Sequence, residues 1–378
     1  MNLTDNDLDK IIKAREQEED TEEETVKAVM PPQDVVVYNE MRSCMDLFLM
    51  WKKGKLDIKP DFQRDIVWKN KEMSLFIDSL MKQLPIPSIC ISWDASSGKR
   101  TVIDGLQRLA TIIRFLNYQE EDWKISQVDG VDERIGGLTV KQICAKEPRL
   151  YQILEEATLP INVIRCDYAQ SNHMEYLFQI FSRLNSGGRR LLYQEIRNCI
   201  YQGPLNTFLK SYVRGENWLR FVGQNAEDIG RYRFGHEERA LRFLAFYDNW
   251  ETYSSSLVQF LNQYMSAHRN MPEREVEDYR EMLDRVLVQI SRIEGKKDTR
   301  KNWNAMEGVL LGIAKNLPFV ETLNTGELSA RYGALLNTPE FVGRMKEGVM
   351  HGPKVRERIE KSIQYFGPGY EPQAGADL

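Results

Sequence analysis

One stretch of the chain changes from strand-like to helix-like spacing of its apolar residues within a few positions. Residues 88–94 and 99–103 are rich in strand-forming residues and are separated by a Ser-Ser-Gly turn at 96–98, which predicts a β-hairpin. Apolar residues then recur every three or four positions, as in an amphipathic helix, at Leu106, Leu109, Ile112, Ile113 and Leu116. The pattern therefore places Asp104 and Gly105 in a turn between a strand and a helix.

The rest of the first half alternates between short strands and helices, whereas the second half has a helical pattern. We predict strands at residues 35–38 and 159–166, and helices at 41–53, 71–83, within 138–156 and at 172–184. His173, in the last of these helices, is expected at the surface. After residue 204 we predict helices at 205–213, 236–261, 273–293 and 303–317. The predicted fold class is therefore α+β, followed by an α-helical domain.

This pattern divides the chain into four parts. Residues 1–33 are an acidic leader, 34–203 an α+β domain, 204–366 an α-helical domain and 367–378 a flexible tail. The leader is dense in Glu and Asp, which resists packing, so we expect a disordered, solvated arm. The alternative is an arm that mimics nucleic acid and covers a basic groove.

Composition excludes several classes of protein. The net charge of -5 means that any surface for nucleic acid must be local. The five cysteines are widely spaced without a CxxC pair, which indicates free thiols rather than disulfides or a zinc ribbon. Neither a secretion signal nor a membrane-spanning run is recognisable, so we expect a cytoplasmic protein without a membrane partner. The P-loop, GxGxxG, HExxH and GxSxG motifs are absent.

The predicted turn at Asp104 and Gly105 has the character of a phosphate-binding site. Glycine allows an anion to approach the backbone, and the amides at a helix start point towards it. Arg108 offers a planar fork for phosphate oxygens, while Asp104 is suited to hold a metal ion or a water. The alternative interpretation is purely structural, because Asp is a common helix cap and Gly a common turn residue.

Two further stretches carry polar residues next to turn signals. Gln63 and Arg64 follow a break at residues 59–61, and they form a Gln-Arg pair like Gln107 and Arg108. Asn185, Arg189 and Arg190 surround a Ser-Gly-Gly loop, which suits either an oxygen-rich site for metal and phosphate or an ordinary helix-loop-helix corner.

Arg231 and Arg233 lie among aromatic residues near the start of the predicted helical domain. Arginines interleaved with aromatic side chains grip phosphates and stack on bases, but they also occur in ordinary domain interfaces. We therefore keep both residues as candidates for nucleic-acid contact.

Four motifs occur in order along the first half of the chain: FQRDIVW, LPIPS, VIDGLQR and FSRLNSGGRRL. In this order and spacing they resemble the N-terminal domain of GmrSD-type modification-dependent restriction proteins, whose signature is Asp-Gly-Gln-Gln-Arg. The resemblance covers about residues 35–200. Because that family is similar to the ParB and sulfiredoxin fold, it implies a ParB-like nucleotide-binding domain.

The resemblance also implies an activity, which is binding and hydrolysis of a nucleoside triphosphate with Mg²⁺ in defence against foreign DNA. The nucleotide-binding residues would be Gly105, Arg108, Gln63, Arg64, Asn185, Arg189 and Arg190. Asp104 and Gln107 would be catalytic, and Asp104 and Asn185 would hold the metal.

Two departures from the family pattern bear on this expectation. Leu106 replaces the third residue of the signature, and the chain has no His-Asn-His nuclease pattern, so a partner subunit is expected to cut DNA. Two alternatives are a non-enzymatic DNA-binding adaptor and a weak metal-dependent nuclease. Other defence subunits and self-association are left open as partners.

Overall fold

The computed structural model describes residues 8, 11–13, 15, 30–58, 68–184, 191–254, 256–294, 303–338, 341 and 350–371. Its contacts divide the chain into two compact units. Ala28–Leu191 form the first, here called the sheet unit. Met1–Lys27 and Leu192–Leu378 together form the second, here called the helical unit. The sheet unit is therefore inserted between two segments of the helical unit.

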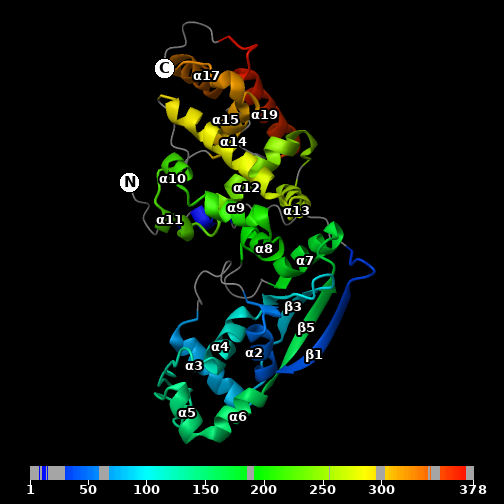
Figure 1. The fold of residues 1–378 in the computed structure, drawn as a ribbon, viewed down its shortest axis with the longest axis vertical. Helices are drawn as coiled ribbons and strands as arrows, with labels where there is room; N and C mark the ends of the chain where they lie inside the picture. Colours follow the sequence, from blue (N-terminus) through cyan, green and yellow to red (C-terminus); the bar gives the residue numbers. More distant parts are fainter. Residues whose placement is uncertain are drawn as a thin grey trace. The chain divides into compact units, whose positions relative to one another are not determined.

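The sheet unit contains a five-stranded mixed sheet, which lies at one side of the unit in Figure 1. Its strands are β1 (Val36–Ser43), β2 (Leu56–Asp57), β3 (Ile89–Asp94), β4 (Arg100–Asp104) and β5 (Thr158–Cys166), in the order β1-β5-β3-β4-β2. β1 is antiparallel to β5 and β3 to β4, whereas β5 is parallel to β3 and β2 to β4. The α+β class and the β3–β4 hairpin are thus confirmed.

The hairpin turn is stabilised by a buried carboxylate. Asp94 accepts hydrogen bonds from the hydroxyls of Ser96 and Ser97 and from the backbone N–H of Tyr168. Gly98 completes the turn with a φ of 71°, in the left-handed region that glycine tolerates. The Ser-Ser-Gly sequence therefore forms the turn of the hairpin, as predicted from its turn-forming residues.

Helices and strands of the sheet unit share one apolar core. The helices are α2 (Cys44–Lys52), α3 (Asn70–Met81), α4 (Leu106–Leu116), α5 (Val140–Lys146), α6 (Pro148–Glu156) and α7 (Ser171–Leu184). Leu47 of α2, Ile77 of α3 and Ile112 of α4 are fully buried together with Val102 and Ile161 of the sheet. The three-and-four spacing of α4 thus places its apolar side against this core.

Two details of the sheet unit differ from the prediction. Met41 to Ser43 belong to β1 rather than to a helix, because they continue the regular pairing with β5 until Ser43 caps α2. His173 is buried rather than exposed at the surface. Its Nε2 lies 2.8 Å from a carboxylate oxygen of Asp34, and its Nδ1 accepts a hydrogen bond from the backbone N–H of Asp167.

The described residues of the helical unit form helices and no strand. They are α8 (Tyr193–Ile200), α9 (Pro204–Tyr212), α10 (Glu216–Val222), α11 (Ala226–Arg231), α12 (Gly235–Asn249), α13 (Leu257–Ala267), α14 (Glu273–Arg292), α15 (Trp303–Lys315), α16 (Leu317–Val320), α17 (Thr325–Asn337) and α19 (Gly352–Phe366). The helix predicted at 236–261 is divided by a 3₁₀ turn, η2 (Trp250–Thr252). α15 and α19 approach closely at Gly312, where a Cβ would lie 2.5 Å from the carbonyl oxygen of Ser362.

Ile12 and Arg15 of the acidic leader pack within the helical unit. Ile12 is buried, and the guanidinium of Arg15 donates hydrogen bonds to the carbonyls of Tyr232 and Arg233 and to the carboxylate of Glu238. For these residues the expectation of a solvated arm is wrong.

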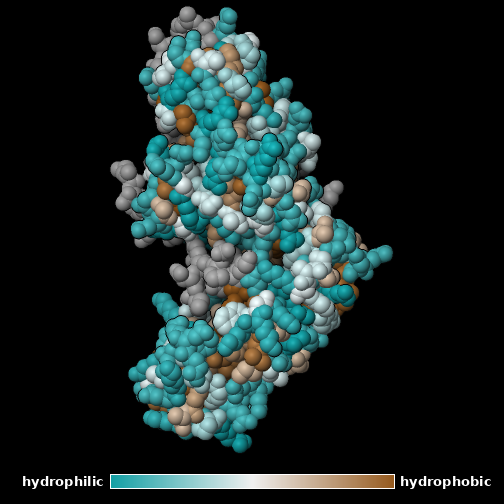
Figure 2. Space-filling view, in the orientation of Figure 1, coloured by the Kyte–Doolittle hydropathy of each residue, from teal (hydrophilic) through white to brown (hydrophobic). Residues whose placement is uncertain are grey.

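No helix in the described parts of the chain is both long and apolar enough to cross a membrane. The face drawn in Figure 2 is mostly hydrophilic, with hydrophobic residues scattered between polar ones.

Candidate functional site

The turn between β4 and α4 requires glycine at position 105. Gly105 has a φ of 89° and a ψ of 16°, which side chains with a Cβ rarely adopt. A Cβ there would lie 2.8 Å from Cγ1 of Ile89 and 3.1 Å from Nη2 of Arg108. Gly105 is buried, and the close packing of Ile89 and Arg108 around it leaves no room for a side chain, so the shape of the turn depends on glycine.

The start of α4 is electrostatically suited to an anion. No side chain caps its first amides, and its first turn contains no acidic residue. The helix dipole adds roughly half a positive charge at this end. Since most helices begin with a polar cap, an uncapped start beside glycine leaves amide donors for a ligand or for water.

Arg108 in the first turn is held by three acceptors of the chain itself. Its Nη1 donates to the carbonyl oxygens of Pro87 and Ser88, and its Nη2 lies 2.9 Å from a carboxylate oxygen of Asp104. These bonds use three of the five N–H donors of a guanidinium. The side chain of Arg108 is 15% exposed and that of Asp104 is 42% exposed. Arg108 thus braces the segment before β3 against the turn, while Asp104 presents its carboxylate to solvent.

Gln107 connects this turn to a second motif of the sequence. Its Oε1 accepts a hydrogen bond of 3.3 Å from the backbone N–H of Trp68, the last residue of FQRDIVW. The motif containing Gln63 and Arg64 therefore ends beside the α4 turn. Gln63 and Arg64 themselves lie outside the described residues, and so do Asn185, Arg189 and Arg190. Their contribution to the site stays a prediction.

Asp104 is the one predicted metal ligand that the structure describes. Within the described residues, no group of three or more His, Cys, Asp or Glu side chains is placed to hold a metal ion. Mg²⁺ commonly uses only one or two carboxylates and takes its remaining ligands from water and phosphates. The site therefore suits a metal that arrives with a phosphorylated ligand better than a permanently bound one.

Two residues beside the turn were not predicted from the sequence. Asn162 of β5 donates a hydrogen bond of 3.1 Å to the hydroxyl of Ser88, whose carbonyl holds Arg108. Cys90 pairs with Asp104 across the hairpin, and burial, with the charge of Asp104, raises the pKa of its thiol to about 12. An amide within the otherwise apolar run LPINVI was a signal that could have revealed Asn162.

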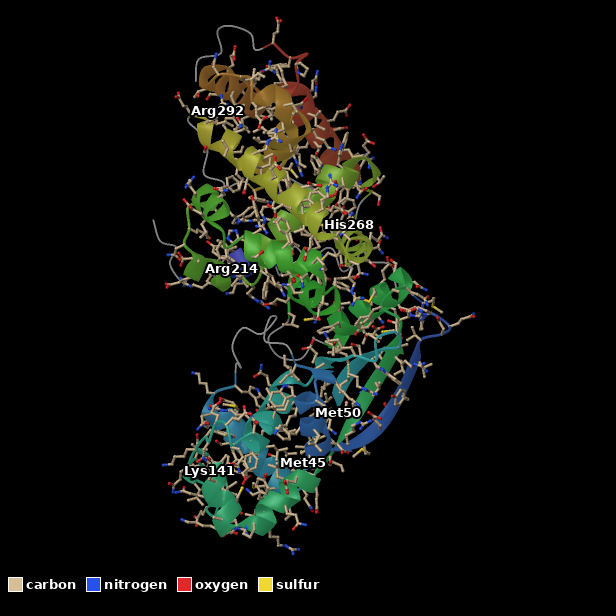
Figure 3. The ribbon with its side chains drawn as sticks, in the orientation of Figure 1. Met45, Met50, Lys141, Arg214, His268 and Arg292 are labelled. Atoms are coloured by element: carbon tan, nitrogen blue, oxygen red, sulfur yellow. The ribbon has the colours of Figure 1, made fainter. Side chains whose placement is uncertain are left out.

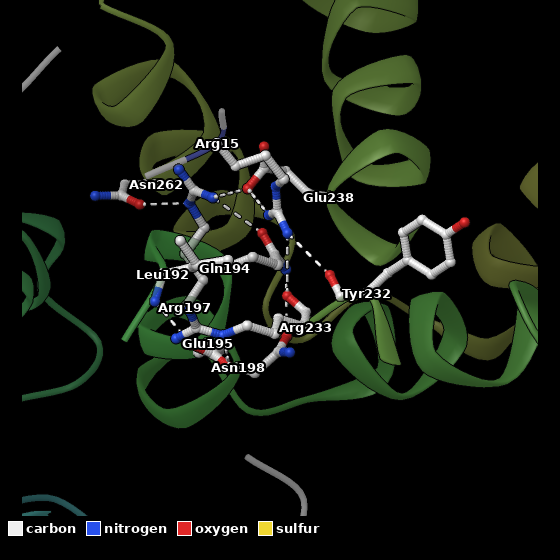
Figure 4. A network of polar contacts seen from close by, with 10 residues as sticks. All are labelled: Arg15, Leu192, Gln194, Glu195, Arg197, Asn198, Tyr232, Arg233, Glu238 and Asn262. Carbon is white, nitrogen blue, oxygen red and sulfur yellow. Dashed lines mark hydrogen bonds and ion pairs between the residues drawn. The ribbon is translucent and has the colours of Figure 1, made fainter. Parts of the chain in front are cut away.

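Arg233 is buried inside the helical unit, where it pairs with Glu195 (Figure 4). Its side chain is 1% exposed and forms two hydrogen bonds, of 3.1 and 2.6 Å, with the carboxylate of Glu195. This burial is at odds with the expected contact to nucleic acid and gives Arg233 a structural role. Arg231 is 40% exposed and lies 3.6 Å from Asp228. For Arg231 the expectation stays a prediction.

α8 carries four polar residues of the network in Figure 4, which are Gln194, Glu195, Arg197 and Asn198. Arg197 donates to Asn262 at 2.9 Å and to Gln194 at 3.0 Å, and every residue of α8 is buried. A fully buried helix whose polar groups bond to one another is part of a core. Among the described residues, the sequence following the Ser-Gly-Gly loop thus contributes packing rather than a ligand site.

Comparison with protein families gives one match. The model described as GmrSD restriction endonuclease, N-terminal domain, matches residues 46–202, which include β2 to β5 and helices α3 to α8. No curated protein and no solved structure matches the chain. The ParB-like form of the fold therefore stays a prediction within the α+β class. Over residues 46–202 this chain is therefore similar to the GmrSD restriction endonuclease N-terminal domain family.

Proposed function

We propose that this protein is the nucleotide-binding component of a restriction system, and that the β4–α4 turn binds the phosphates of a nucleoside triphosphate. The family match supports the role in restriction, because its members are described as restriction endonucleases. DNA is accordingly the expected final target. We further propose that a partner subunit carries out the cleavage.

The observation that carries the proposal is the combination of Gly105 and Arg108 at an uncapped helix start. A Cβ at position 105 would occupy the space beside the backbone and push against Arg108. The first amides of α4 and the dipole behind them stabilise negative charge. Arg108 keeps two N–H donors beyond its three bonds to the chain, so it can contact an anion at the turn while its bonds to Pro87 and Ser88 hold it in place.

The remaining residues of the turn have separate roles in this proposal. Asp104 would contribute a carboxylate to a Mg²⁺ ion that arrives with the phosphates, and the ion would neutralise charge on the phosphate oxygens. Gln107 accepts a hydrogen bond from the backbone N–H of Trp68 and so holds the end of the FQRDIVW motif beside the turn. Leu106 places an apolar side chain where the family signature has glutamine, and it is the first residue to test if binding occurs without hydrolysis.

The test is binding and hydrolysis with matched variants of the full chain. Titration calorimetry with Mg²⁺ and ATP, GTP or CTP would measure binding by the wild type, by Arg108→Ala and by Arg149→Ala. Arg149 is an exposed arginine at the start of α6, so its loss removes the same charge elsewhere in the unit. We expect Arg108→Ala to weaken binding at least tenfold, because a charged hydrogen bond is worth about 1.5–3 kcal/mol. Arg149→Ala should bind as the wild type does.

Phosphate release separates hydrolysis from binding. We expect Asp104→Asn to lose release while it keeps most of the nucleotide affinity, because the substitution removes the metal-binding charge and keeps the side-chain shape. Equal binding by the wild type and Arg108→Ala would remove Arg108 from the site. Undetectable binding of every nucleotide by the folded wild type would refute the proposal.

A further inference from the structure

A row of side chains crosses the sheet at the end that carries the β3–β4 hairpin. Trp93 of β3 pairs with Arg100 of β4 on one side and with Arg165 of β5 on the other. Side chains of directly paired residues point to the same face of a sheet. The three side chains therefore stand in one row.

The two arginines stack on the tryptophan ring between them. The guanidinium carbon of Arg100 lies 4.7 Å from the ring centroid of Trp93, and that of Arg165 lies 5.1 Å from it. Because β4 and β5 flank β3, the two guanidinium groups are held roughly 10 Å apart with Trp93 as a rigid spacer. Stacking fixes the plane of a guanidinium and leaves its N–H edge for other partners.

Among the described residues, no ion pair involves Arg100 or Arg165, whereas Arg108, Arg114 and Arg134 of the same unit each pair with an acidic residue. The Nε of Arg100 and the Nε1 of Trp93 are buried donors without a hydrogen-bond partner within the described chain. These two atoms are too deeply buried to contact a partner from outside the chain, so any such contact falls to the other N–H groups of the guanidinium.

Further positive charge lies beside the row. The backbone N–H of Arg100 donates to the carbonyl of Lys55, so the turn between α2 and β2 is adjacent to the row. Lys53 and Lys55 of this turn are exposed, and so is Lys52, the last residue of α2. In a chain with a net charge of -5, this is a local concentration of basic residues.

We propose that the row Arg165–Trp93–Arg100, with the lysines of the α2–β2 turn, binds the phosphate backbone of duplex DNA. Two oriented guanidinium groups without carboxylate partners and neighbouring flexible lysines are the groups that position a protein on a duplex without reading its sequence. This inference rests on the proposed role in a restriction system, because that role makes DNA the expected partner. It does not depend on nucleotide binding at the β4–α4 turn.

The test measures binding of the full chain to a labelled duplex of mixed sequence by fluorescence anisotropy, at salt concentrations from about 50 to 200 mM. The variant Arg100→Gln/Arg165→Gln keeps side-chain size and removes both charges. Its control is Lys141→Gln/Arg149→Gln, which removes two exposed charges from α5 and α6 of the same unit; Lys141 is labelled in Figure 3. Circular dichroism establishes that both variants are folded.

We expect the arginine variant to bind at least tenfold more weakly than the wild type. The slope of log affinity against log salt should become shallower by about 1.8, since each lost phosphate contact contributes about 0.9. The control should retain the wild-type slope. A second variant, Trp93→Phe, should weaken binding with an unchanged slope, because both charges remain but the spacer is smaller.

Three results would overturn the proposal. They are wild-type binding that is absent or independent of salt, an arginine variant with the wild-type slope, and a control that loses as much as the arginine variant. Displacement of DNA by polyglutamate of equal total charge would show that the row binds acidic polymers in general. That result would also refute the proposal. Arg108→Ala should keep the wild-type slope of log DNA affinity against log salt. A loss of DNA binding by the row is therefore distinguishable from a loss of nucleotide binding at the β4–α4 turn.

Discussion

Replacing Gly105 by alanine tests the geometry of the candidate site without altering its charge. The substitution places a Cβ on a backbone with a φ of 89° and within 2.8 Å of Cγ1 of Ile89. The left-handed conformation costs a residue with a Cβ about 1–2 kcal/mol. Forcing extra volume into a packed position costs about 1–3 kcal/mol more. We therefore expect Gly105→Ala to lower the local free energy of unfolding by roughly 2–5 kcal/mol.

Gly98 in the hairpin turn is the matched control. Its φ is 71°, but a Cβ there would have no neighbour within 4 Å. Gly98→Ala should therefore show only the conformational cost of about 1–2 kcal/mol. The difference between the two variants isolates the contact with Ile89 and Arg108.

Because the chain has two compact units, the measurement must be local. Native-state hydrogen exchange of peptides covering residues 100–116, at increasing urea, reports the opening free energy of β4 and α4 directly. If Gly105→Ala is no more destabilising than Gly98→Ala, the close approach of Gly105 to its neighbours does not determine the turn, and the proposed site loses its geometric basis.

Three further predictions concern the helical unit. Arg233→Ala should destabilise it by about 3–5 kcal/mol in urea unfolding, because the buried Glu195 loses its partner, and Glu195→Gln should partly restore stability. Arg15→Ala should lower stability by about 1–3 kcal/mol in the same assay, through the loss of three hydrogen bonds. Burial and nearby arginines hold the pKa of His236 well below its ordinary value. Only the unfolded state then takes up this proton, so stability should fall below about pH 6.5, by at most about 1.4 kcal/mol per pH unit, and His236→Phe should flatten that dependence.

Local patterns predicted those parts of the fold that depend on neighbouring residues. The spacing of apolar residues located α4, and the Ser-Ser-Gly sequence located the hairpin turn, because helix period and turn chemistry are properties of short segments. The same reasoning placed Asp104 and Gly105 between a strand and a helix.

Long-range partners explain where the prediction from sequence was incomplete. His173 is buried because Asp34, 139 positions away, bonds to its ring. Arg233 is buried because Glu195 and the leader both reach it. Arg108 is held by the backbone carbonyls of Pro87 and Ser88, and the pattern of side chains in the sequence does not predict such backbone contacts. In each case the side chain alone permitted two outcomes, and a residue far away in the sequence determined which one the fold adopts.

The inserted position of the sheet unit has a consequence for how the chain is made. Arg15 is synthesised 217 residues before Tyr232, whose carbonyl it binds in the finished protein. At about 5–20 residues per second, a ribosome needs roughly 10–40 s to bridge that interval. The whole sheet unit emerges within this time and has all its own contacts available. The helical unit, by contrast, can close around Arg15 only after the whole sheet unit has been translated.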